Sequence, residues 1–338
     1  MPLKSKHSIA VITGGYSNER VVSLKSCKNV IESIDKNLFT PYIIEISKKK
    51  WNCLYNGKNI PVDKNDFSVT IKSKKIKFSL IVFALHGTPA EDGKLQGYFD
   101  LIGIPFLGCN NFISALTFNK YFTNIFARAH GIRVEDSILI NSNRNLKKKL
   151  EEKKHLISYP CFVKPNKSGS SFGASKVRNF KELELSVKKS FQEDDEVLIE
   201  KFILGRELTI GVLEMNGKIK ALPITEAITK NPFFDFNAKY NKEALEITPA
   251  EIPKEIELKI KETAIKIYQV FQCQGIIRID FILKKSTSQF YFLEINTIPG
   301  LTNQSFIPQQ FEKAKLSFER YLTKTIMNKL DKKNNEFR

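Results

Sequence analysis

Short apolar runs alternate with amphipathic stretches through the first part of the 338-residue chain. Runs of strand length occur at residues 8–13, 80–85 and 104–107, and helical spacing of apolar residues occurs at 21–34 and 91–101. Alternation of this kind predicts βαβ units in an open, mainly parallel sheet, with functional loops at the carboxyl ends of the strands. We therefore expect an N-terminal α/β domain with a Rossmann-like sheet.

The remaining pattern predicts two further units that mix strands and helices. Between residues 110 and 204 it indicates a helix at 118–130 and strands at 161–164 and 197–200. Beyond residue 205 it indicates strands at 208–213 and 218–223, a helix at 254–271 and a C-terminal helix. The expected division is 1–109, 110–204 and 205–330, with a lid loop at 228–250 and a charged, frayed tail at 331–338.

Two apolar runs near the C-terminus, residues 275–283 and 290–295, are separated by a polar turn and predict a β-hairpin. Four polar side chains lie on it: Arg278, Asp280, Glu294 and Asn296. Side chains two positions apart on a strand point to one face, so these four could enter one pocket and offer three oxygen ligands and a guanidinium. Such ligands suit Mg²⁺ that bridges phosphate oxygens, whereas a salt-bridged hairpin face explains the same residues without a metal.

The composition fits a folded chain kept in a reducing compartment. Hydrophobic residues make up 42%, which is ample for a core, and the apolar runs are too short to cross a bilayer. The apolar run after the N-terminus is also too short for a signal peptide, so the cytoplasm is the expected location. Five scattered cysteines without a C-x-x-C pair exclude a zinc ribbon and argue against disulfides.

The formal net charge of +18 raises the alternative of a nucleic-acid partner. The excess is mostly lysine, dispersed in runs such as 48–50 and 147–149, without interleaved aromatic residues. A lysine-rich surface with a local need to hold phosphates is the favoured explanation. We expect neither a nucleic-acid nor a membrane partner.

Residues 164–173, Lys-Pro-Asn-Lys-Ser-Gly-Ser-Ser-Phe-Gly, follow a predicted strand. Small residues let backbone N–H groups approach phosphate oxygens, and Lys164 adds charge, although a flexible surface turn explains the loop equally well. The loop is neither a Walker A motif nor a dinucleotide fingerprint. The strand at 197–200 leads into a hinge that could face a purine, and Glu207 could accept from ribose hydroxyls. The alternative for Glu200 and Glu207 is a solvated charge at a strand end.

Together these motifs resemble the D-alanine–D-alanine ligase family of the ATP-grasp superfamily. The matching motifs run in the order of that family from Gly14 to about Pro308. The resemblance implies the ATP-grasp fold, with a Rossmann-like domain, a central nucleotide-binding subdomain and a C-terminal α+β domain. It also implies ATP-dependent joining of two D-alanine molecules for peptidoglycan synthesis, commonly by a homodimer.

The resemblance further implies which residues bind ATP and metal. Lys120, Lys164 and Lys239 match the phosphate-contacting lysines, and Ser170 and Ser171 match the serines of the glycine-rich loop. The residues that match the adenine and ribose site are Glu200, Lys201, Phe202, Ile203 and Glu207. The residues that match the ligands of two Mg²⁺ ions, for which Mn²⁺ could substitute, are Asp280, Glu294 and Asn296.

The amino-acid substrates would be held from both ends of the chain. By resemblance, Glu19 receives the ammonium of the first D-alanine and His86 contacts its carboxylate, while Ser305 and Phe306 hold the second D-alanine. A structural explanation exists for the first two, because acidic residues favour helix N-termini and a lone histidine after a strand is usually structural.

Catalysis would depend on charge and closure rather than on a covalent nucleophile. By resemblance, Arg278 and the Gly300 N–H stabilise the tetrahedral intermediate, and Tyr240 bonds toward Glu19 and Ser170 as the lid closes. Water exclusion would protect an acyl phosphate from hydrolysis.

The chain departs from the family pattern at a few positions, and alternatives remain open. Ala90 stands where the family usually has glycine, and Phe234 and Phe236 replace tyrosines of some members. A relative that accepts D-lactate is one alternative, although the lid tyrosine, Tyr240 here, is characteristically replaced in such relatives. A non-catalytic ATP-binding relative is another, and the complete set of residues on the hairpin argues against it.

Overall fold

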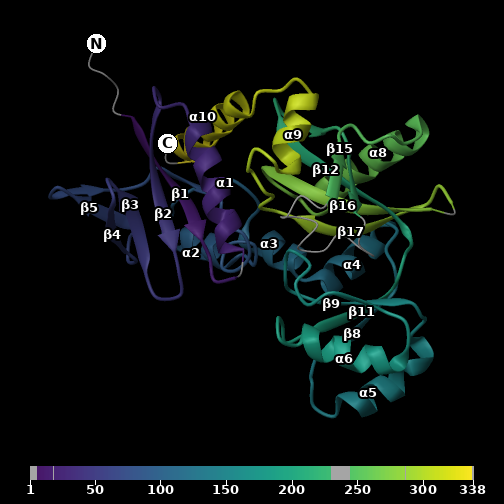
Figure 1. The fold of residues 1–338 in the computed structure, drawn as a ribbon. Helices are drawn as coiled ribbons and strands as arrows, with labels where there is room; N and C mark the ends of the chain where they lie inside the picture. Colours follow the sequence, from purple (N-terminus) through teal and green to yellow (C-terminus); the bar gives the residue numbers. More distant parts are fainter. Residues whose placement is uncertain (1–5, 18, 230–243, 286, 337–338) are drawn as a thin grey trace.

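The computed structural model describes residues 6–17, 19–229, 244–285 and 287–336. Three β-sheets, each accompanied by helices, make up the molecule (Figure 1). No helix among these residues is both long and apolar enough to cross a membrane.

The first sheet has seven strands in the order β6-β5-β4-β3-β2-β1-β7. The strands are β1 (His7–Gly14), β2 (Phe39–Ile46), β3 (Trp51–Tyr55), β4 (Lys58–Asp63), β5 (Ser68–Ile71), β6 (Lys74–Ile76) and β7 (Leu80–Phe83). β1 pairs in parallel with β2 and β7, and the pairings from β2 out to β6 are antiparallel. The helices of this part are α1 (Arg20–Ser33) and α2 (Lys94–Leu101).

Two expectations for the first sheet are wrong. The sheet is mainly antiparallel, because residues 39–76 form a meander of short strands. Many positions of these strands are exposed, which weakens the apolar pattern in the sequence. The predicted strand at 104–107 is reduced to one bridge between Ile81 and Phe106. Pro105 has no N–H to donate, so the ladder beside β7 cannot extend through it.

The second sheet has the order β10-β9-β11-β8 and is antiparallel throughout. Its strands are β8 (Ser137–Ile140), β9 (Cys161–Pro165), β10 (Ser175–Val177) and β11 (Val197–Lys201). The helices are α3 (Asn111–Phe118), α4 (Lys120–Ala129), α5 (Leu146–Lys153), the short η1 (Lys154–Leu156) and α6 (Phe180–Ser190). The helix predicted at 118–130 therefore begins at Lys120, because Asn119 is extended and caps it.

The third sheet has the order β15-β14-β12-β16-β17, with β13 paired to β12. Its strands are β12 (Gly205–Met215), β13 (Lys218–Ala221), β14 (Thr225–Thr229), β15 (Ala244–Ile247), β16 (Ile276–Lys284) and β17 (Phe290–Asn296). The helices are α8 (Lys254–Val270), α9 (Phe306–Lys313) and α10 (Phe318–Glu336). The hairpin prediction is confirmed. Of the loop expected at 228–250, residues 228–229 belong to β14 and residues 244–247 belong to β15.

Helix α10 ties the end of the chain to its beginning. Ile326 and Leu330 of this helix are buried in one apolar cluster with Ile9 and Val30 of the first sheet and α1. Figure 1 shows α10 lying beside α1. Helix α10 extends to Glu336, so residues 331–336 of the expected tail are helical.

Candidate functional site

A cavity of about 570 Å³ lies where the three sheets approach one another. Its lining comes from the start of α1, the ends of β9 and β11, the β16–β17 hairpin and the loop before α9. All the site residues predicted within the described part of the chain line this cavity. The fold thus brings together side chains that are far apart in sequence.

The hairpin supplies a cluster of charges to the cavity. In the ladder, Arg278 lies opposite Asn296 and Asp280 lies opposite Glu294. The Arg278 guanidinium donates to both carboxylate oxygens of Asp280 at 2.9 Å, and Thr209 of β12 donates to Oδ1 at 2.6 Å. Glu294 lies 3.8 Å from Arg278. The carboxylates are therefore held in place by the cation beside them.

The donor set of the hairpin fits Mg²⁺ that arrives with a nucleotide. Asp280 and Glu294 are carboxylates on paired strands with 21% and 30% of their side-chain surface exposed, and the Asn296 amide lies beside them. Among the described residues, no cluster of three or more His, Cys, Asp or Glu is placed to hold a metal alone. Two carboxylates and an amide leave positions of an octahedral ion for phosphate and water.

Two of the three predicted phosphate lysines lie among the described residues, and each is placed against a carboxylate. Lys164 Nζ, at the end of β9, lies 2.7 Å from Glu200 Oε2 on β11. Lys120 Nζ, at the start of α4, donates to the Ser168 carbonyl at 2.6 Å and lies 3.6 Å from Glu294. Both ammonium groups face the cavity, where they could neutralise phosphate oxygens.

The hinge after β11 forms another wall of the cavity. Lys201, Phe202 and Ile203 line it together with Glu207 of β12. The Phe202 N–H donates to the Pro160 carbonyl at 3.1 Å, and the Lys176 ammonium lies 4.0 Å from the centre of the Phe202 ring. A fixed hinge with apolar surface can hold the flat face of a purine.

Glu19 and the glycine-rich loop meet at the other end of the cavity. Glu19 is the N-cap residue of α1, is 8% exposed and makes no side-chain capping bond. Its carboxylate instead accepts from Ser170 Oγ at 2.5 Å. Ser170 and Ser171 hold positive φ angles of 52° and 59°, so the loop backbone is strained where it turns toward Glu19.

His86 is held from both sides of its ring. Nε2 lies 3.0 Å from Ser26 Oγ of α1, and Nδ1 lies 3.7 Å from Glu91 Oε1. Burial raises the pKa of Glu91, the His86 bond opposes that rise, and the charge of Glu19 adds to it. His86 therefore lines the cavity with a fixed ring orientation.

The loop between β17 and α9 closes the substrate end. The hydroxyls of Ser305 and Thr302 lie 2.8 Å apart, and the Thr302 N–H donates to Ser305 Oγ at 3.1 Å. A side chain at Gly300 would put a Cβ 2.8 Å from Ser305 Oγ. Phe306, at the start of α9, lies with its ring 5.9 Å from the Arg278 guanidinium. The sequence motif thus folds into one compact turn.

Three supporting residues were missed by sequence reasoning. Ser26 accepts from the Leu301 N–H at 3.3 Å besides contacting His86, so α1 joins the two substrate loops. Thr209 holds Asp280, and Asn166 lies behind the phosphate loop. Their signal in the sequence is weak, because a polar residue does not reveal a partner that is distant along the chain. Lys239 and Tyr240 lie outside the described residues.

The phosphate loop is bordered by a carboxylate with an unusual titration. Asp194 is 6% exposed at its side chain and accepts the Lys167 N–H at 2.5 Å. Burial raises the pKa of Asp194 from 3.8 to about 6, and the neighbouring Asp195 acts in the same direction. The folded protein therefore retains a proton that the unfolded chain loses between those two values, and the resulting stabilisation disappears as the pH rises through about 6.

Asp194→Asn should accordingly stabilise the protein at neutral pH. We expect the free energy of unfolding to rise by about 1–2 kcal/mol at pH 7.5, since an amide still accepts the Lys167 N–H without a buried charge. The gain should shrink to about a third at pH 4.5, where the Asp194 carboxyl of the folded protein is already protonated and only the unfolded chain is ionised. Urea denaturation at both pH values measures it, and an equal gain at both would contradict the assignment.

The chain matches two family models and is similar to known ligases along nearly its whole length. Residues 8–109 match the family model for the D-ala D-ala ligase N-terminus, and residues 126–327 match that for its C-terminus. The D-alanine–D-alanine ligase of Phocaeicola vulgatus is 42% identical over 96% of this chain and 99% of its own length. The D-alanine–D-alanine ligase of Flavobacterium johnsoniae is 44% identical over 94% of this chain and 98% of its own length.

Solved structures agree with these matches. The D-Ala:D-Ser ligase VanG of Enterococcus faecalis superimposes with a TM-score of 0.83 at 33% identity, over 96% of this chain and 98% of that one. The D-alanyl-alanine synthetase A of Vibrio cholerae superimposes with a TM-score of 0.85 at 26% identity, over 97% of this chain and 99% of that one. The fold is that of the ATP-grasp class of ligases. Within that class, the chain belongs to the D-alanine–D-alanine ligase family.

Proposed function

We propose that this protein joins two D-alanine molecules to D-alanyl-D-alanine for peptidoglycan precursors, and cleaves ATP to ADP and phosphate. The observation that carries the proposal is that the Glu19–Ser170 pair and the Arg278–Asp280 pair of the hairpin line the same cavity. One end offers a carboxylate to a substrate ammonium, and the other offers cations and metal ligands to phosphates. A carboxylate–amine ligase needs both.

The first step would activate a carboxylate, which is a poor acyl donor. A carboxylate oxygen of the first D-alanine attacks the γ-phosphorus of ATP, an O–P bond forms, and the bond to ADP breaks. Lys120 and Lys164 would bind the phosphates from α4 and β9, and Lys239 would add a third charge from the segment between β14 and β15. These residues supply position and charge rather than a covalent bond.

The second step would form the peptide bond. The free amine of the second D-alanine attacks the acyl carbon, loses a proton, and expels phosphate as the C–O bond breaks. Arg278 and the Gly300 N–H would bind the oxyanion, while Ser305 and Phe306 would hold the attacking molecule. Glu19 and His86 would keep the first molecule in place, and Tyr240 would exclude water that could hydrolyse the acyl phosphate.

Two Mg²⁺ ions, for which Mn²⁺ could substitute, would be held by Asp280, Glu294 and Asn296. When bound, they would neutralise the phosphate oxygens and orient the γ-phosphoryl group for in-line attack. Arg278 already fixes Asp280 in the site, and Glu294 lies within reach of Lys120.

Phosphate release from ATP and Mg²⁺ should depend on D-alanine, with the dipeptide identified by mass. L-alanine should give no product, and D-alanine offered with D-lactate or D-serine should still give the D-alanyl dipeptide as the main product. The names of the curated relatives favour D-alanine over D-lactate as acceptor. Release without a dipeptide would point to another acceptor, and no release with any pair would contradict ligase activity.

We further propose a cytoplasmic homodimer with a division of the chain at residues 109 and 204. Three apolar side chains on successive helices support self-association, because Leu101, Phe112 and Phe122 are 88%, 66% and 52% exposed on α2, α3 and α4. Light scattering at micromolar concentration would measure the oligomeric state.

A further inference from the structure

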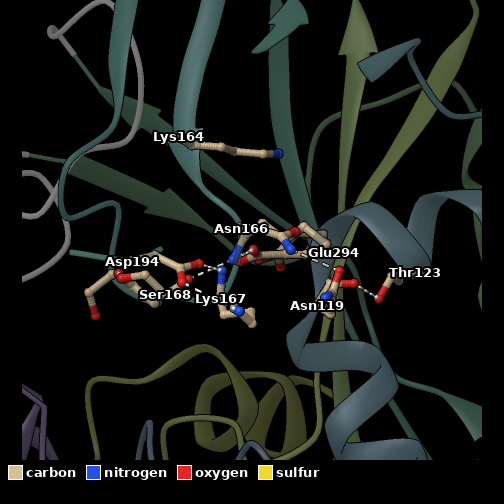
Figure 2. Close-up of polar contacts among 12 residues, drawn as sticks. Asn119, Thr123, Lys164, Asn166, Lys167, Ser168, Asp194 and Glu294 are labelled. Carbon is tan, nitrogen blue, oxygen red and sulfur yellow. Dashed lines mark hydrogen bonds and ion pairs between the residues drawn. The ribbon is translucent and has the colours of Figure 1, made fainter. Parts of the chain in front are cut away.

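Asn166 is a fully buried amide at the start of the phosphate loop. It follows Pro165, where β9 ends, and has 0% of its surface exposed. Figure 2 shows it between Asn119, at the start of α4, and the loop residues Lys167 and Ser168. The sequence places it in the candidate phosphate loop but assigns no role to its side chain.

The side chain of Asn166 uses both amide hydrogens and its oxygen. Nδ2 donates to Glu196 Oε2 at 2.7 Å and to Asn119 Oδ1 at 3.0 Å, and Oδ1 accepts from the Tyr121 N–H at 2.8 Å. The backbone N–H also donates to the Glu196 carbonyl at 2.9 Å. A buried amide with every bond made has one orientation.

These bonds cap α4 from outside the helix. The Lys120 N–H donates to the Asn166 carbonyl at 3.3 Å, the Tyr121 N–H to its side chain, and the Phe122 N–H to Asn119 Oδ1 at 3.1 Å. The first N–H groups of a helix normally lack partners within the helix. The first three N–H groups of α4 already have acceptors. The helix therefore offers the cavity the Lys120 side chain rather than unpaired backbone N–H groups.

A second set of contacts fixes the loop behind Asn166. Glu196 Oε2 accepts from Asn166 and lies 3.2 Å from Lys167 Nζ. The backbone N–H of Lys167 is held by Asp194, and Lys120 Nζ reaches the Ser168 carbonyl at 2.6 Å. Asn166 is therefore the point at which β9, the loop and α4 are joined.

We propose that Asn166 is a positioning residue that fixes Lys120 relative to Lys164, and thereby sets the geometry in which the ATP phosphates bind. Lys164 lies two residues before Asn166 on β9, and Lys120 begins the helix that Asn166 caps. A displacement of one lysine relative to the other would weaken contacts to a triphosphate that spans both. The proposal rests on the assignment of both lysines to phosphates under the proposed function.

A charge-exchange experiment tests this role. Asn166→Asp keeps the acceptor for the Tyr121 N–H but turns a carboxylate oxygen toward Glu196 and Asn119. We expect the KM for ATP to rise about tenfold and kcat to fall, with the KM for D-alanine unchanged. Adding Glu196→Gln supplies an amide that can donate to the new carboxylate, so the double variant should recover most of the loss.

A matched pair of helix caps separates positioning from stability. Asn119→Ala and Asn179→Ala each remove an N-cap asparagine in the second unit, from α4 and from α6 respectively. Both should lower the Tm by similar amounts. Only Asn119→Ala, which loses its bond to Asn166, should raise the KM for ATP. This pair also keeps the test decisive if Asn166→Asp does not fold.

Three results decide between the explanations. An increase in the KM for ATP confined to the Asn166 and Asn119 variants, with recovery in the double variant, supports the proposal. A KM for ATP that stays at the wild-type value while the Tm falls overturns it. If wild-type protein makes no dipeptide, the proposed function fails instead, and direct ATP binding by calorimetry still measures the role of Asn166.

Discussion

Replacing Glu294 with glutamine should reduce turnover by about a thousandfold or more, with the fold intact. The substitution keeps the size of the side chain but removes one of the two carboxylates proposed to hold Mg²⁺, and metal neutralisation of phosphate charge contributes several kcal/mol to such reactions. Lys120 and Arg278, which lie 3.6 and 3.8 Å from Glu294, would also lose an anionic neighbour.

Asp280→Asn should be at least as damaging, for an additional reason. Both oxygens of Asp280 accept from Arg278, so the substitution also releases the guanidinium proposed to stabilise the oxyanion. Glu255→Gln on α8, whose side chain is 76% exposed in a surface pair with Lys259, is the matched control and should retain full activity. Steady-state kinetics across a Mg²⁺ titration measures the effect. Normal turnover in either hairpin variant would overturn the metal assignment.

Local patterns in the sequence predicted the hairpin and its polar face because neighbouring strands carry their own evidence. Residues 276–284 and 290–296 are mainly apolar runs on either side of a polar turn, and the polar residues within each run lie two positions apart, on one face of the strand. The break between α3 and α4 was missed because Asn119 does not disturb the apolar pattern. Only its extended backbone and its capping bond reveal the boundary.

Contacts that join distant segments could not be read from the sequence. The link from Ser26 to Leu301 spans 275 positions, and that from Asn166 to Asn119 spans 47. Each depends on how helices are placed on different sheets, which periodicity does not encode. The strands of residues 39–76 were missed for a different reason, since β4 and β6 are short and largely exposed, and they hold too few apolar positions to show a period.

Gly169 provides a second large effect, because it lies directly against Glu19. A Cβ added at this position would lie 2.7 and 2.9 Å from the two oxygens of the Glu19 carboxylate, which is closer than such atoms can approach. The obstructed group is the end of a flexible side chain, so the fold can adjust by rotating it. That rotation would move the Glu19 carboxylate away from Ser170, whose Oγ donates to it at 2.5 Å.

Gly169→Ala should therefore lower kcat/KM for D-alanine by about a hundredfold while changing the Tm and the KM for ATP little. Gly97→Ala on α2, where a Cβ would meet nothing closer than 3.7 Å, is the control and should behave as wild type. A double-mutant cycle identifies the cause. If the alanine acts by displacing Glu19, adding it to Glu19→Ala should produce no further loss, since the group it displaces is already gone. Fully additive losses would show instead that Gly169 acts through the loop backbone, and that the Glu19–Ser170 contact is not what its small size protects.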